Sequence, residues 1–404
     1  MTTVTGQQYE KLTVENVPAY IASRPALARR VDPAAITEVR EVGDGNMNIV
    51  FAVQVAGRPG VVLKQAMPYV RVAPDWPVTP DRNRIEARVL AAHGDVAEGL
   101  VPALYDEDED RHVVALEDLS DHQVWRGRLN DAVQDEGVAE DLGRYVARVA
   151  FGTSVFGLGP YAHKAGVAAS VNPELCEITE DLVFTEPYIE HEHNRVLPAN
   201  AADVAAYAGD PAVRTGIGLA KLSFMTHAEA LIHGDLHTGS VLVRPASDGV
   251  PRSTRAFDVE FAFYGPAGFD IGALWGNYAL AAARALALKD EHHATWVLGL
   301  AAQTWDAFAT EFTALWPGRA DLRVFGDGVL EGYLAKVRAD AARFAAAKAA
   351  RRVIGFSGVS DIQTLPEDLR VRAVRGVLRA ARHLLTAPAP SFTTVGGLLA
   401  DAVA

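Results

Sequence analysis

The chain has 404 residues, enough for two or three domains or one two-lobed enzyme, and its 49% hydrophobic and 22% charged composition is typical of a globular protein. The formal net charge of −13 argues against a nucleic-acid or anionic-membrane partner, because such partners normally select a basic surface. The single cysteine, Cys176, excludes an internal disulfide. We therefore expect an inert buried thiol in a cytoplasmic protein.

The N-terminal part is predicted to be rich in β-strands after a helical start. Short runs of β-forming residues alternate there with glycine clusters, a pattern typical of hairpins. In chain order we expect helical structure over 8–30 with an interruption at Pro18, strands over 38–42, 49–55 and 61–64, a proline-rich loop over 68–81, a helix over 81–93 and a strand over 111–116.

The rest of the chain is predicted to be mainly helical, and it is rich in alanine, the best helix former. Residues 231–270 are the exception, since they contain short strand patterns. The longest apolar stretch, Ile271–Leu288, is interrupted by polar residues and therefore indicates a buried helix, not a membrane span. The expected fold class is α+β, with a small β-rich N-terminal lobe (1–118) and a larger, mainly helical C-terminal lobe (119–404).

A glycine-rich turn and a strand lysine are the first candidate functional residues. Glycines in the turn Gly43–Asn48 would let the backbone approach phosphate oxygens. Kinases use a strand lysine to neutralise the α- and β-phosphates and pair it with a helix glutamate. Lys64 and Glu86 fit this pattern. The alternatives are an ordinary hairpin turn and a solvated glutamate.

The segment His-Gly-Asp-Leu-His-Thr-Gly-Ser (233–240) follows an apolar run. Protein kinases carry His-Arg-Asp at the corresponding place, with an asparagine five residues after the aspartate. Here glycine replaces the arginine, and Ser240 stands at the asparagine position. Asp235 is therefore the candidate residue that faces a hydroxyl group to be phosphorylated. The alternative interpretation is a polar turn.

Two further acids, Asp258 and Glu260, are predicted to share one face of an extended segment. Carboxylates this close repel each other unless a cation lies between them, and Mg²⁺ prefers such oxygen ligands. The flanking Phe257, Val259 and Phe261 indicate a buried setting, which argues against two unrelated surface acids. We expect Asp235, Asp258 and Glu260 to converge on one nucleotide.

These motifs resemble the signature of the 5-methylthioribose kinase family, a group of small-molecule phosphotransferases in the protein-kinase-like superfamily. The strongest match is residues 226–240. The other matching stretches are 43–48, 64–69, 75–77, 81–86, 117–122, 151–154, 184–188, 258–266 and 268–272. The resemblance thus extends over most of the chain.

The resemblance implies a bilobal protein-kinase-like fold and phosphorylation of the anomeric hydroxyl of 5-methylthioribose by ATP and Mg²⁺, a step of methionine salvage. It also implies a homodimer, with a nucleotide-binding lobe over 1–118 and a catalytic, substrate-binding lobe over 119–404. The implied residues are Asn48, Lys64, Glu86, Glu117, Asp118 and Leu119 for ATP, Asp258 and Glu260 for the metal, Asp235 for catalysis, and Asp235, Trp76, Arg351 and Arg352 for the sugar.

The chain departs from the family pattern after the arginine pair, where it has Val353–Ser360, and before it, where Phe344–Ala350 is unusually rich in alanine. An insertion-like stretch over 245–253 is predicted to be a surface loop. The arginine pair could instead be the exposed end of a basic helix. The alternatives that stay open are a kinase of the same fold for another sugar, an amino alcohol or an aminoglycoside, and a catalytically silent binding protein. A metal hydrolase built on His191, His193, His233 and His237 lacks a full ligand set at the usual spacing.

Overall fold

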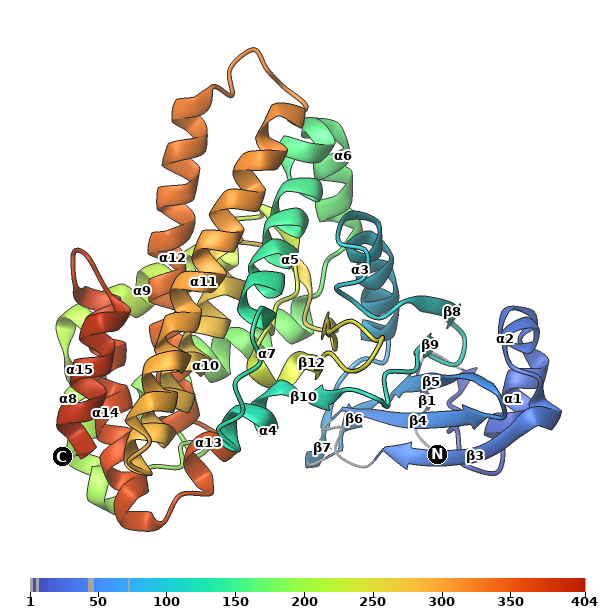
Figure 1. The fold of residues 1–404 in the computed structure, drawn as a ribbon, viewed down its shortest axis with the longest axis horizontal. Helices are drawn as coiled ribbons and strands as arrows, with labels where there is room; N and C mark the ends of the chain where they lie inside the picture. The colour runs from blue at the N-terminus through green and yellow to red at the C-terminus, as the bar shows by residue number, and fades with distance from the viewer. Residues whose placement is uncertain (1–2, 5–6, 43–46, 72, 404) are drawn as a thin grey trace. The chain divides into compact units, whose positions relative to one another are not determined.

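The computed structural model describes residues 3–4, 7–42, 47–71 and 73–403. The chain forms two compact units, one of residues 1–122 with 257–261 and one of residues 123–256 with 262–404. The first unit is built on a β-sheet, and the second consists mostly of helices (Figure 1). The expected α+β class, β-rich at the N-terminus and helical beyond it, is confirmed. The assignment of a nucleotide-binding role to 1–118 and a catalytic role to 119–404 stays a prediction.

The small unit contains an antiparallel sheet with the strand order β3-β4-β5-β9-β8. Its elements are β1 (Thr3–Val4), β2 (Gln7–Gln8), α1 (Val17–Ser23), α2 (Pro25–Arg30), η1 (Pro33–Ala35), β3 (Ile36–Val42), β4 (Asn48–Val55), β5 (Arg58–Ala66), β6 (Tyr69–Val70), β7 (Ala73–Pro77), α3 (Arg82–Val96), β8 (Leu104–Asp108) and β9 (Val113–Glu117). Strands β6 and β7 pair as a short hairpin inside the segment predicted to be a loop.

The two faces of the small sheet have different chemistry. Leu63 on β5 joins an apolar core with Leu12, Ile21 and Leu27 from the N-terminal segment. Because side chains alternate along a strand, Lys64 points to the opposite face. Lys64 is 6% exposed, so the fold places a charged side chain in a buried position there.

The helical start differs from the prediction of helix over 8–30, because the helices cover only Val17–Ser23 and Pro25–Arg30 and residues 8–16 are not helical. Pro18 lies in the first turn of α1 and does not separate two helices; the break is at Arg24, and Pro25 opens α2. Proline is favoured in a first turn, because the N–H it lacks would have no intrahelical partner there.

The large unit contains the remaining elements. They are β10 (Gln123–Val124), α4 (Trp125–Asn130), α5 (Val138–Gly152), α6 (Val155–Ala169), α7 (Pro173–Phe184), η2 (Glu186–Tyr188), η3 (Pro198–Asn200), α8 (Ala201–Gly209), α9 (Pro211–Thr226), β11 (Ala230–Ile232), η4 (Thr238–Ser240), β12 (Val241–Arg244), β13 (Ser253–Ala256), β14 (Phe263–Gly265), α10 (Gly268–Ala287), α11 (Glu291–Leu315), η5 (Trp316–Gly318), α12 (Asp327–Ile354), α13 (Ser360–Gln363), α14 (Glu367–Thr386) and α15 (Phe392–Val403). The predicted buried apolar helix is confirmed as α10. Within the described part of the chain, no helix has the length and apolar character that crossing a bilayer requires.

Close packing of α10 against α12 explains the alanine-rich stretch. A Cβ atom on Gly272 of α10 would lie 2.6 Å from Phe344 Cβ and 2.7 Å from the Ala341 carbonyl oxygen of α12. Gly268 and Gly276, one turn to either side, face the same helix equally closely. Only small side chains fit where two backbones approach this closely. Packing as well as helix propensity therefore explains the buried alanines of α12.

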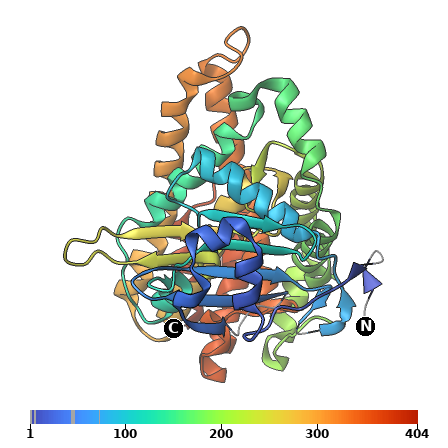
Figure 2. The ribbon, with the colours of Figure 1, turned by 90° about the vertical axis from the view of Figure 1, so that its right-hand side faces the viewer.

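The stretch 245–253 forms the tip of a hairpin between β12 and β13, which pair in antiparallel register. Residues 245–252 are exposed, so the predicted surface loop is confirmed. Figure 2 shows the yellow hairpin extending away from the helices of its own unit. At its base Arg252 and Thr254 bind Asp141 of α5.

Cys176 of α7 is half-buried, and burial raises the pKa of its thiol to about 12, which disfavours a reactive thiolate.

Candidate active site

Lys64 is the centre of a charged cluster in the small unit. Its Nζ lies 2.8 Å from Glu86 Oε1 on α3, so the predicted strand lysine and helix glutamate form an ion pair. Lys64 also donates a hydrogen bond to Asp258 Oδ1. Both Lys64 and Glu86 are buried, whereas the side chain of Asp258 is 46% exposed. The structure therefore brings three of the predicted site residues together.

The backbone around Asp258 is not extended, and the expectation that Asp258 and Glu260 share one face of an extended segment is wrong. Asp258 has a φ of 68°, in the left-handed region that a non-glycine residue rarely adopts. This conformation turns the chain, so Asp258 is exposed while Glu260 is 4% exposed. Such an outlier at a cluster of charged residues is typical of functional sites.

Glu260 belongs to a second, fully buried part of the cluster. Its Oε2 accepts hydrogen bonds from Asn48 Nδ2 at 2.8 Å and from Arg82 Nε at 3.1 Å. Arg82 also donates to the carbonyl oxygens of Met67 and Thr79, at 2.8 Å each, and to that of Met47. Arg82 thus fastens the end of the glycine-rich turn to Glu260. Residues 43–46 of that turn lie outside the described residues.

The acids of this cluster outnumber its cations within the described residues. Burial opposes the charge of Lys64, but the carboxylates of Asp258, Glu86 and Glu260 outweigh it and raise the pKa of Lys64 above its ordinary value. Burial, together with Asp258 and Glu260, raises the pKa of Glu86 to about 7 despite Lys64. The neighbouring carboxylates contribute to both shifts, since Lys64 and Arg82 face three acids. The cluster can therefore accept a further cation with oxygen ligands.

The other residues predicted to contact ATP or the sugar in this unit lie farther along the chain. Glu117 ends β9, and its N–H donates to the carbonyl oxygen of Ala103 at 2.9 Å. Asp118 accepts from the Ser120 N–H at 3.0 Å, and Leu119 is buried. Trp76 lies on β7 with a partly exposed side chain.

Asp235 lies on a tight loop of the large unit that follows β11. The carboxylate of Asp270, at the start of α10, accepts from the backbone N–H groups of His233 at 2.8 Å and Gly234 at 3.1 Å. Gly234 has a φ of 82°, which glycine adopts without strain. Ser240 Oγ donates to the Asp235 carbonyl oxygen at 2.7 Å. These bonds define the backbone of the loop and aim the Asp235 side chain.

The carboxylate of Asp235 is contacted on both oxygens. Lys348 Nζ of α12 lies 2.5 Å from Oδ1, and His237 Nε2 lies 3.4 Å from Oδ2. The Asp235 side chain is 23% exposed. Although burial disfavours its charge, Lys348, His237 and Arg352 lower the pKa of Asp235 well below its ordinary value. Asp235 is therefore ionised at neutral pH.

Arg351 and Arg352 lie in the last turn of α12 and are 7% and 9% exposed, so the interpretation as an exposed basic helix end is wrong. Burial and neighbouring cations lower the pKa of both guanidiniums. Arg126 of α4 lies 3.3 Å from the buried Asp361 of α13 and donates to Asn277 at 2.7 Å. Cations thus outnumber acids around Asp235 within the described residues. The expected convergence of Asp235 with Asp258 and Glu260 stays a prediction, because Asp235 belongs to the other unit.

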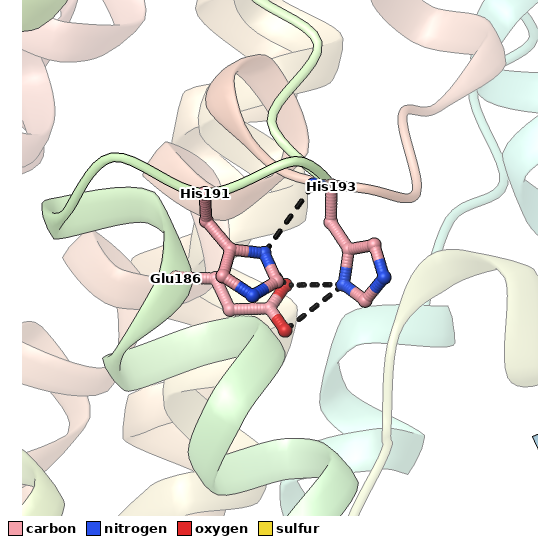
Figure 3. Close-up of side chains that lie close together, drawn as sticks. All are labelled: Glu186, His191 and His193. Atoms are coloured by element: carbon pink, nitrogen blue, oxygen red, sulfur yellow. Dashed lines mark hydrogen bonds and ion pairs between the residues drawn. The ribbon is translucent and has the colours of Figure 1, made fainter.

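His191 and His193 lie beside Glu186 of η2 (Figure 3). Both carboxylate oxygens of Glu186 lie 3.0 Å from His193 Nδ1, and His191 Nδ1 accepts from the His193 N–H at 3.3 Å. These hydrogen bonds account for the positions of all three side chains. The cluster fastens the loop after η2. A second group, His227, Glu229 and Asp340, already contains a cation, because Lys336 binds both of its acids.

Comparison with known proteins assigns the chain that forms this site to a family. Residues 38–302 match the model of the phosphotransferase enzyme family. The chain is 39% identical over 386 residues to the methylthioribose kinase of Cronobacter sakazakii and 38% identical over 398 residues to that of Klebsiella pneumoniae, with 94% of each chain covered. The chain belongs to the methylthioribose kinase family. A solved glucosamine kinase aligns with 91% of this chain and 86% of its own at 17% identity and a TM-score of 0.49.

The structure places further ionisable residues beside the predicted ones, and the sequence motifs did not indicate a role in this site for them. They are Arg82 in the small unit and Arg126, His237, Lys348 and Asp361 in the large unit. His237 lies inside the motif that identified Asp235, so its spacing could have indicated it. Lys348 lies one helical turn before Arg351 on the same face, a spacing that links neighbours on a helix. Arg126 and Asp361 carry no local signal.

Proposed function

We propose that the protein transfers the γ-phosphoryl group of ATP to the anomeric hydroxyl of 5-methylthioribose, giving 5-methylthioribose 1-phosphate in methionine salvage. The observation that carries this proposal is the identity of 37–39% to several methylthioribose kinases over nearly the whole chain. Catalysis of phosphoryl transfer depends on positioning and on neutralising charge. Each unit contains charged residues suited to one of these tasks.

The small unit is proposed to bind the nucleotide and a divalent metal. Lys64, oriented by Glu86, binds the ATP phosphates, and Glu117, Asp118 and Leu119 line the adenine pocket. Asn48 contacts the phosphates, which requires its side chain to exchange its present partners, Glu260 and Arg82.

The excess of acids fits a divalent cation, and oxygen ligands favour Mg²⁺. Asp258 fits better than Glu260, since its side chain is partly exposed, whereas Glu260 Oε2 already accepts two hydrogen bonds. The metal, when bound, neutralises charge on the phosphates.

The large unit is proposed to bind the acceptor. Asp235 accepts a hydrogen bond from the anomeric hydroxyl and orients its oxygen for attack on the γ-phosphorus. Arg351 and Arg352 stabilise the negative charge of the transferred group and contact the sugar. Buried Arg351 Nε has no hydrogen-bond partner among the described residues, so a donor remains for an anionic oxygen. Trp76 is proposed to close over the sugar.

The remaining proposals concern the setting of the enzyme. A cytoplasmic location is supported by the single cysteine, and a homodimer follows from the family resemblance alone. The chain needs ATP and one small sugar as partners, without nucleic acid or membrane. Light scattering of the purified protein would measure the mass that decides the oligomeric state.

A coupled assay of ADP release tests the proposed function. The purified protein with Mg-ATP would be offered 5-methylthioribose, ribose, glucosamine, choline and kanamycin at equal concentrations. We expect methylthioribose to give the highest kcat/KM and phosphorus NMR to show a phosphate on the anomeric carbon. Release of ADP with another acceptor and not with methylthioribose would contradict the proposal and favour a kinase of different specificity.

A further inference from the structure

Lys348 is a buried cation that the proposed roles of the other residues leave unexplained. It lies on α12, one turn before the arginine pair, and is 3% exposed. Its Nζ lies 2.5 Å from Asp235 Oδ1 and 4.9 Å from the centre of the Phe269 ring. A buried ammonium group in contact with the carboxylate that faces the acceptor affects how that carboxylate binds protons.

Asp235 is held from two sides by different kinds of donor. His237 Nδ1 accepts from the Gly239 N–H at 2.9 Å, so the ring proton of neutral His237 lies on Nε2, which faces Asp235 Oδ2. Burial, with Arg126 and Arg352, lowers the pKa of His237 to about 3, so this ring is neutral at pH 7. Lys348 is therefore the charged residue of the two, and it binds the opposite oxygen.

We propose that Lys348 is a positioning residue that holds Asp235 ionised and correctly oriented, so that the enzyme is active only while Lys348 carries its proton. The proposal rests on the proposed function, because it requires Asp235 to face the acceptor hydroxyl. The paired carboxylate is a weak base. It accepts a hydrogen bond from the hydroxyl, and it takes the hydroxyl proton only as the bond from the hydroxyl oxygen to the γ-phosphorus forms and the bond from that phosphorus to the leaving oxygen of ADP breaks.

The charges around Lys348 make its protonation sensitive to pH near neutrality. Burial and the two arginines lower the pKa of Lys348 to about 8, although Asp235 supports its charge. Below about pH 8 the charged ammonium forms an ion pair with Asp235, and above it the neutral amine no longer supplies the positive charge. The titratable and charged groups that act on Lys348 or Asp235 are His237, Asp270, Arg351 and Arg352. Arg126 acts on His237 and on both arginines, and Asp361 acts on Arg352.

Steady-state kinetics from pH 6 to 10 tests the proposal with three variants. The wild type should lose kcat as the pH rises through about 8. Lys348→Arg should keep most of the activity but lose this alkaline decline, since a guanidinium does not titrate there. Lys348→Met should lower kcat roughly a hundredfold, as a misplaced catalytic group does, with the KM for Mg-ATP unchanged.

Lys336→Met is the matched control. Lys336 lies on the same helix and likewise forms ion pairs, here with Glu229 and Asp340. This variant should keep the pH profile of the wild type. Wild-type kcat and an unchanged alkaline decline in Lys348→Met would overturn the proposal. An equal loss of kcat in Lys336→Met would overturn it too, because the effect would then reflect the integrity of α12.

Carbon NMR of lysine labelled at Cε separates this proposal from the proposed function. The wild type should show a resonance that titrates near pH 8, absent in Lys348→Arg. In Asp235→Asn the same resonance should titrate at lower pH, because the supporting carboxylate is lost. An unshifted resonance would refute the ion pair. A wild type inactive on methylthioribose would refute the proposed function alone, since the titration needs no substrate.

Discussion

Each unit of the molecule contains a buried lysine bound to an aspartate, but the two pairs have opposite electrostatic surroundings. Lys64 of the small unit is shared by Asp258, Glu86 and Glu260, and these acids raise its pKa. Lys348 of the large unit stands beside Arg351 and Arg352, and its pKa falls to about 8. The same residue pair thus gives a permanent charge in one unit and a titratable charge in the other.

This difference follows from which sign of charge is in excess. The acids in excess around Lys64 suit a divalent metal ion that also binds phosphates. The cations in excess around Asp235 suit a phosphoryl group that carries negative charge as it moves. The comparison indicates that a salt bridge should be interpreted from its wider surroundings as well as from the distance between its two atoms.

The largest effect is expected from changes to the two aspartates. Asp235→Asn should lower kcat by roughly a hundredfold or more, the range typical of a lost acid–base group, and leave nucleotide binding intact. Asp258→Asn should instead abolish metal-dependent ATP binding. Calorimetry with Mg-ATP and turnover assays on both variants measure this. Equal loss of ATP binding in the two variants would contradict the division of roles between the units.

A smaller effect is expected when the cation of the small unit is removed. Lys64→Met leaves Glu86 and Asp258 without their shared cation, so ATP should bind more weakly and kcat/KM for ATP should fall by roughly one to two orders of magnitude. The KM for methylthioribose should not change. Arg58→Met, an exposed residue of the same strand, is the control for surface charge. A normal KM for ATP in Lys64→Met would show that the phosphates do not depend on this lysine.

The packing of α10 against α12 offers a change that affects one unit alone. Gly272→Val should displace α12 and with it Lys348 and the arginine pair, at a cost of about 1–3 kcal/mol in the free energy of unfolding, as overpacking typically does. Turnover should fall while ATP binding remains. Gly299→Val is the control, because a Cβ atom at Gly299 of α11 meets nothing within 4 Å. A normal kcat in Gly272→Val would contradict the expectation that activity depends on the position of α12.

The smallest expected effect is a change in how stability depends on pH. The unfolded lysine titrates near 10.5 and folded Lys348 at about 8, so between these values the unfolded chain binds more protons and stability rises with pH. Lys348→Met should remove this contribution. Lys336 has a raised pKa, because Glu229 and Asp340 outweigh its burial, so its contribution is lost only above pH 10.5. Urea unfolding at pH 8 and pH 10 should therefore distinguish the two methionine variants.

The sequence predicted the parts of the site that local pattern defines. Asp235 follows from its motif, and Lys64 follows from its place on a predicted strand after the glycine-rich turn. The pairing of Lys64 with Glu86 followed from kinase chemistry, and the structure confirms it. The left-handed turn at Asp258 could not be predicted, because an aspartate favours that conformation only when its surroundings enforce it. Lys348 was missed for a similar reason: helix periodicity places it near the arginines, but only tertiary packing brings α12 to Asp235.

The return of segment 257–261 to the small unit has a consequence for dissecting the protein. Cutting the gene after codon 122 would yield a first fragment that lacks Asp258 and Glu260, and a second that carries these acids without Lys64, Asn48 and Arg82. Neither product could be complete, so we expect separately expressed halves to be inactive until they are mixed. The same threading would prevent recombination from exchanging either half for that of a distant relative by a single crossover.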